Sequence, residues 1–110
     1  MVNNSAYLDG VFFALADPTR RRILERLARR PLTAGEIASG FSISQPAVSK
    51  HLKVLEQSHL VERTIVGRTH HCKLSPKAMD AAAAWLDRQQ RYWEAALDKL
   101  SLYLENSNDG

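Results

Sequence analysis

Two helix starts lie close together in the first half of this 110-residue chain, and their spacing strongly constrains the fold. Thr33 and Glu36 have the spacing of a capping box, in which each side chain accepts a hydrogen bond from the other residue's backbone N–H. Residues 40–42, Gly-Phe-Ser, interrupt that helix within about two turns. Ser44 is a second N-cap, and Pro46 suits the first turn that follows it. The segment therefore predicts two short helices joined by a tight turn, which is a helix-turn-helix.

The rest of the chain predicts further helices and one hairpin. Hydrophobic residues at helical spacing indicate a first helix, and Asp17-Pro18 caps a second. β-branched residues on either side of Gly67-Arg68 predict a β-hairpin. The expected fold is mainly α with a β-hairpin, a winged helix-turn-helix of order α-α-α-α-β-β-α. We expect one domain over residues 1–110, with helices over 5–16, 18–30 and 76–104, the helix-turn-helix over 33–58 and the wing over 60–74.

Composition is that of an ordinary globular protein, with 45% hydrophobic and 25% charged residues. The single cysteine, Cys72, excludes an internal disulfide and fits a reducing compartment. No apolar run approaches the ~18 residues of a membrane span, and residues 1–5 do not resemble a signal peptide. We therefore expect a cytoplasmic protein without membrane partners.

Charge is unevenly distributed along the chain. Residues 1–77 hold twelve Lys and Arg against six Asp and Glu, a net charge of +6, whereas residues 78–110 hold three against six, a net charge of −3. A basic segment of this kind favours a polyanionic partner, although solvated surface charge is an equal alternative from charge alone.

The second helix of the helix-turn-helix has two distinct faces. Val48, Leu52 and Leu55 form its inner face, so the polar residues between them point outward. In a helix-turn-helix that binds double-stranded DNA, this helix enters the major groove, where Gln pairs with adenine and Lys with guanine or phosphate. Arginines on the hairpin suit a narrow minor groove or the phosphate backbone. The predicted DNA-binding residues are Ser44, Gln45, Pro46, Ser49, Lys50, Lys53, Arg63 and Arg68.

Two stretches carry a specific family resemblance. Residues 15–24, LADPTRRRIL, and residues 44–55, SQPAVSKHLKVL, resemble the opening and the recognition helix of the ArsR/SmtB family of winged-helix repressors. Leu60-Val61 and Gly67-Arg68 are similar to that family's strand and wing. The resemblance implies a dimeric, DNA-binding transcriptional repressor whose first and last helices form the dimer interface.

The last helix also suggests a dimer on its own pattern. It carries two adjacent apolar stripes, and a helix of roughly thirty residues cannot bury both against a small head. One stripe is therefore expected to pack on a second subunit, together with the first helix. The expected interface residues are Tyr7, Val11, Phe12, Trp93, Leu97, Leu100 and Leu104.

The family's known metal sites are absent from this sequence. Residues 36–41 lack the cysteine pair of the arsenic-type site, and residues 76–105 lack the histidines of the zinc-type site. His70, His71 and Cys72 remain, but only His70 and Cys72 share one face of a strand, and two ligands do not complete a site. We expect no metal and no cofactor, and the sequence names no effector.

His51 and the three consecutive arginines have ordinary structural interpretations. His51 lies at the border of a buried face, where a partly buried, hydrogen-bonded histidine is the first expectation and a phosphate contact the second. Arg20, Arg21 and Arg22 fan over about 200° of helix and cannot all face DNA.

The five isolated glycines form no phosphate-binding loop, and we expect no enzyme. A winged helix used as a protein-interaction module is the alternative function.

Overall fold

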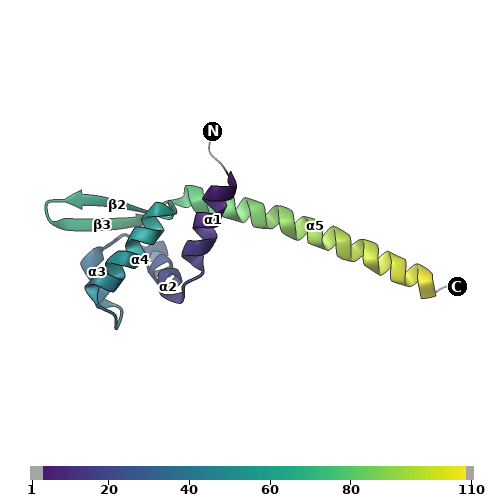
Figure 1. Cartoon of the computed structure of the whole chain (residues 1–110), viewed down its shortest axis with the longest axis horizontal. Coiled ribbons are helices and arrows are strands. Elements are labelled where there is room, and N and C mark those ends of the chain that lie inside the picture. The colour runs from purple at the N-terminus through teal and green to yellow at the C-terminus, as the bar shows by residue number, and fades with distance from the viewer. Residues whose placement is uncertain (1–3, 109–110) are drawn as a thin grey trace. The chain divides into compact units, whose positions relative to one another are not determined.

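The computed structural model describes residues 4–108 and consists of helices and a small three-stranded antiparallel sheet (Figure 1). It confirms the expected mainly helical fold with a hairpin. The chain groups into two compact units that divide between Asp80 and Ala81; we call residues 4–80 the head. The elements are α1 (Asn4–Leu15), α2 (Pro18–Arg29), β1 (Leu32–Thr33), α3 (Ala34–Ser39), α4 (Gln45–Gln57), β2 (Val61–Val66), β3 (Thr69–Leu74) and α5 (Pro76–Asn108).

The predicted caps fix the starts of three helices. The Asp17 carboxylate accepts a hydrogen bond from the Arg20 backbone N–H at 3.0 Å and begins α2. Thr33 and Glu36 form the complete capping box at α3, with N···O distances of 3.0 and 3.1 Å. The Ser44 hydroxyl caps α4 by accepting a hydrogen bond from the Ala47 backbone N–H at 3.3 Å. Local side-chain chemistry therefore decides where these helices begin.

The sheet contains one strand that the sequence analysis missed. Strand order is β1-β3-β2, so β3 lies in the centre and pairs antiparallel with both neighbours. β1 has only Leu32 and Thr33, which pair with Cys72 and His71. The predicted hairpin is confirmed, with Gly67 at a φ of 63° in its turn. Glycine suits this left-handed conformation because it has no Cβ to clash with the backbone.

The hydrophobic core lies inside the head and draws on every helix and strand there. Full burial of one such aliphatic side chain contributes about 1.5–3 kcal/mol. The buried apolar residues of the head are Val11, Ala14, Ile23, Leu24, Leu27, Leu32, Ile37, Val48, Leu52, Leu55, Leu60, Val61, Cys72 and Ala78. This set corrects one expectation: Val11 is wholly buried within its own chain, so it is a core residue and not an intersubunit contact.

The end of α4 also differs slightly from expectation. The helix ends at Gln57, one residue before the predicted end of the helix-turn-helix at residue 58, because Ser58 caps it and His59 takes a φ of 64°. The buried Ser58 hydroxyl donates to the Leu55 carbonyl at 2.9 Å. The Tyr7 ring stacks on His59 at a centroid distance of 5.5 Å, so α1 and the end of α4 are joined.

From Ala81 onward, α5 presents apolar side chains to solvent. The exposed large hydrophobic residues of this unit are Leu86, Tyr92, Trp93, Leu97, Leu100, Leu102, Tyr103 and Leu104. No helix within residues 4–108 is both long enough and apolar enough to cross a membrane.

Candidate nucleic-acid interface

The two faces of α4 separate as the sequence predicts. Val48, Leu52 and Leu55 are buried, which fixes the helix against the head. The predicted DNA-contacting side chains of this segment are all exposed: Ser44, Gln45, Pro46, Ser49, Lys50 and Lys53. No acidic residue interrupts that surface before Glu56.

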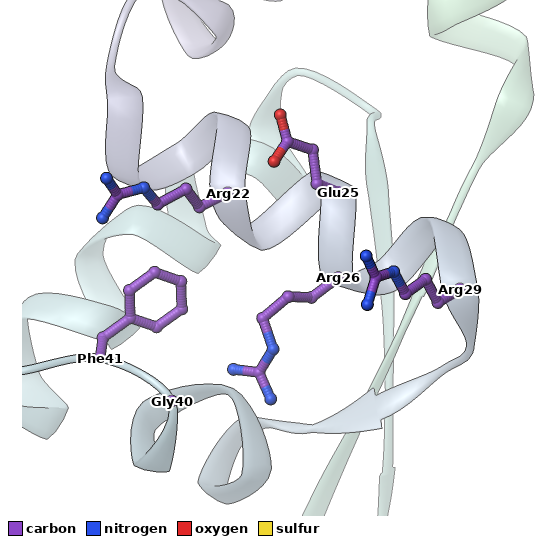
Figure 2. A pocket seen from close by; sticks show the side chains of 6 residues that line it. All are labelled: Arg22, Glu25, Arg26, Arg29, Gly40 and Phe41. Carbon is purple, nitrogen blue, oxygen red and sulfur yellow. The ribbon is translucent and has the colours of Figure 1, made fainter.

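Arg26 of α2 is hydrogen-bonded to the end of α3, next to the turn that leads into α4. The Arg26 guanidinium donates to the carbonyls of Ile37 and Glu36 at 3.1 and 3.3 Å, at the end of α3. The guanidinium carbon of Arg26, Cζ, lies 5.8 Å from the centre of the Phe41 ring. The guanidinium also crosses directly over Gly40, where a Cβ would lie only 2.1 Å from Nη1 (Figure 2). A Cβ at residue 40 would require this guanidinium to move away from the α3 carbonyls, a close approach that the sequence analysis did not anticipate.

A second arginine joins α1 to α4 from inside the head. Arg20 is 9% exposed, and its guanidinium donates to the carbonyls of Ala14 and Phe13, each at 2.8 Å. These bonds satisfy carbonyl groups at the end of α1 that have no partner within the helix. Arg20 Nη1 also lies 3.4 Å from Nδ1 of His51, so His51 is the partly buried, hydrogen-bonded residue that we expected.

Asp17 completes this cluster. Its carboxylate lies 3.8 Å from His51 Nδ1. The hydrogen bond from the Arg20 backbone N–H, more than the nearby His51 and Arg20 charges, holds the pKa of Asp17 below its usual value. Of the three consecutive arginines, only Arg20 is buried; Arg21 and Arg22 are exposed.

The wing contains two arginines in different situations. Arg63 on β2 donates from Nε to the Glu56 carboxylate of α4 at 2.8 Å, and its Nη1 lies 3.4 Å from His70 Nδ1. The guanidinium thus connects the wing to α4. Arg68 is exposed at the hairpin turn and has no hydrogen-bond or ion-pair partner within residues 4–108. Arg68 is the wing arginine available to a polyanion, whereas Arg63 would first have to leave Glu56.

Cys72 is a packing residue in this fold. It is fully buried on the central strand, and burial raises the pKa of its thiol. His70 is half-buried beside Arg63, while the exposed His71 points to the other face. Nowhere in the part of the chain that the structure describes do three His, Cys, Asp or Glu side chains gather in a way that would hold a metal ion.

A helix-turn-helix followed by a hairpin in contact with its second helix is a winged helix-turn-helix, a class of DNA-binding domain. The family model described as "Helix-turn-helix domain" matches residues 15–64. The HTH-type transcriptional regulator Rv2034 of Mycobacterium tuberculosis is 41% identical over 101 residues, covering 92% of each chain. The transcriptional repressor SdpR of Bacillus subtilis is 35% identical over 79 residues, covering 72% of this chain and 88% of SdpR.

A solved structure agrees with these relatives. The crystal structure of the ArsR family transcriptional regulator RHA00566 has a TM-score of 0.79 and 40% identity, covering 86% of this chain and 97% of that one. The chain described here belongs to the ArsR family, and it is a DNA-binding transcriptional regulator.

Proposed function

We propose that the chain acts as a homodimeric repressor that binds an inverted-repeat operator through α4 of each subunit. The observation that carries this proposal is the exposed face of α4, which offers Gln45, Ser49, Lys50 and Lys53 without an acidic neighbour. The similarity to SdpR, a transcriptional repressor, supports repression as the direction of regulation.

Each exposed side chain has a chemical role in this proposal. Gln45, in the first turn of α4, donates to and accepts from the major-groove edge of adenine. Lys50 and Lys53 neutralise phosphates or contact guanine, and Ser49 adds a hydrogen bond to either. The exposed first turn of α4, beginning after Ser44, leaves backbone N–H groups where a phosphate can bind. Arg68 follows the minor groove from the wing.

The dimer is supported by the apolar surface of α5. Trp93, Leu97, Leu100 and Leu104 are 45–67% exposed in the single chain, and they lie on one side of the helix by their spacing. A row of large apolar residues on a soluble domain marks an interaction site, and a second copy of the same row is self-complementary. Two-fold symmetry would then place two copies of α4 about 34 Å apart, one turn of DNA.

Fluorescence anisotropy with operator DNA and scrambled DNA tests the roles on α4. Lys50→Ala is expected to weaken binding to both DNAs and to reduce the slope of log affinity against log salt by about 1. Gln45→Ala is expected to reduce the preference for operator over scrambled DNA by about 1–3 kcal/mol. Lys99→Ala, which removes an exposed lysine from α5, is the control and should leave both affinities unchanged.

Two results would contradict the proposal. One is that the Lys50 and Gln45 variants bind both DNAs as the parent does. The other is elution from heparin at low salt, which would favour the protein-interaction module instead.

A further inference from the structure

A pocket opens between α2 and the turn that precedes α4. Its volume is about 360 Å³, which is within the range of small-molecule sites. It is lined by Arg22, Glu25, Arg26, Arg29, Gly40 and Phe41 (Figure 2). Nothing in the proposed DNA contacts uses these side chains.

The arginines of the pocket come from one face of α2. Arg22, Arg26 and Arg29 follow each other at steps of four and three residues, which brings them to the same side of a helix. Arg26 is already engaged by the α3 carbonyls. Arg22 and Arg29 are exposed, and neither has a hydrogen-bond or ion-pair partner among residues 4–108. Two unengaged guanidiniums beside a concave surface suit a phosphate, which each can bind through two parallel hydrogen bonds.

Phe41 adds an aromatic surface to this cationic site. Its ring is half-buried and contacts Arg26, and Figure 2 shows it on the side of the pocket opposite the Glu25 carboxylate. A planar ring can stack on Phe41 while its charged group reaches the guanidiniums. We propose that the pocket binds a small heteroaromatic molecule that carries a phosphate group.

Occupation of the pocket has a consequence for DNA binding, which rests on the function proposed above. Gly40 and Phe41 belong to the turn, and Phe41 precedes the α4 cap Ser44 by three residues. A bound phosphate adds negative charge close to the end of α4 that approaches the DNA backbone, and like charges repel. The ligand therefore acts as an inducer: it lowers the affinity of the regulator for its operator.

Isothermal titration of the full chain without DNA tests the site itself. Adenosine monophosphate is the probe, and adenosine and inorganic phosphate each supply one half of the proposed recognition. We expect the nucleotide to bind at least about 10-fold more tightly than either half. The double variant Arg22→Gln/Arg29→Gln should weaken nucleotide binding by about 10-fold or more, whereas Arg88→Gln/Arg91→Gln on α5 should leave it unchanged. Absence of nucleotide binding, or equal binding by both double variants, would overturn the proposal.

Operator binding with and without saturating nucleotide tests the regulatory step. We expect the nucleotide to lower operator affinity by about 5-fold or more in the parent, and to have no effect in the Arg22/Arg29 variant. An unchanged operator affinity would overturn the inducer role. If the Arg22/Arg29 variant without nucleotide binds DNA as weakly as Lys50→Ala, the arginines contact DNA and the inducer role of the pocket is overturned. If the parent binds no DNA at all, the proposed function fails, while the titration without DNA still decides the ligand site.

Discussion

The head and the outer part of α5 bury their hydrophobic residues in different ways. In the head, side chains such as Ile23, Leu52 and Leu55 are at most 1% exposed, and the core is closed within one chain. From Ala81 onward, Trp93 and Leu100 remain 67% and 51% exposed. The head is therefore stabilised by its own packing, whereas α5 has an exposed apolar surface, which the proposed dimer would cover.

The same difference separates two tasks. The head holds the proposed DNA-reading face of α4 on a buried core, as a recognition surface requires. In the proposed dimer, the surface of α5 joins two such heads. Substitutions in the head should therefore lower the stability of the folded chain, whereas substitutions on the α5 surface should lower its ability to assemble.

The largest expected effect is in the head. Leu52→Ala removes a buried side chain from α4 and leaves a cavity, so it should lower the free energy of unfolding by about 2–5 kcal/mol. Chemical denaturation monitored by circular dichroism measures this change. Leu100→Ala is the comparison: its effect should depend on protein concentration, because the side chain is exposed in the single chain and would be buried in the proposed dimer. A Leu52→Ala loss that disappears at high protein concentration would contradict the idea of a self-contained head.

The next effect concerns the apolar surface of α5. Trp93→Glu/Leu100→Glu places two charges on that surface and should convert the proposed dimer to a monomer, with operator affinity lowered by about 100-fold. Sedimentation velocity and fluorescence anisotropy measure the two changes. Ala95→Glu adds the same type of charge on the opposite side of the helix and should leave assembly intact. A double variant that stays dimeric would place the interface elsewhere.

A smaller contrast lies within the wing. Arg63→Gln should lower the stability of the head by about 1–2 kcal/mol, because it leaves the half-buried Glu56 carboxylate without its partner. Arg68→Gln should leave stability unchanged and lower DNA affinity, because the side chain is free at the hairpin turn. Thermal unfolding and anisotropy of both variants measure the contrast. The reverse pattern would show that Arg63 releases Glu56 to bind DNA.

The smallest expected effect is the response of the helix caps to acid. Hydrogen bonds at the helix starts lower the pKa of Asp17 and Glu36 in the folded chain below their ordinary values of 3.8 and 4.5. The unfolded chain therefore binds these protons first, and the stabilisation present above those values is lost as the pH falls through the folded-state pKa values. Urea unfolding between about pH 5 and pH 3 should show this decline. Asp17→Asn keeps a capping side chain without a titrating group and should show a shallower decline.

Elements with local signals were predictable from the sequence. The starts of α2, α3 and α4 follow from Asp17, Thr33 and Ser44, since each cap bonds to a residue three positions away. The exposed face of α4 followed from the spacing of its buried residues. The family resemblance added the function, which spacing alone did not supply.

Features that depend on distant contacts were missed. β1 has two residues, too few for a strand pattern, and exists through its pairing with Cys72 and His71. Pairing between Arg63 and Glu56, and the passage of Arg26 over Gly40, join different elements and leave no local pattern. Val11 shares the helical spacing of its neighbours, but spacing cannot distinguish a side buried in the same chain from one buried in a dimer.

Selection of bound DNA from a random pool tests the central claim most directly. For the parent chain, the account predicts enrichment of an inverted repeat whose half-sites lie about 10 base pairs apart from centre to centre. The same selection with Gln45→Ala should retain the spacing and lose base preference within each half-site. Enrichment of an asymmetric single site, or of no sequence at all, would contradict a two-fold regulator that reads DNA through α4.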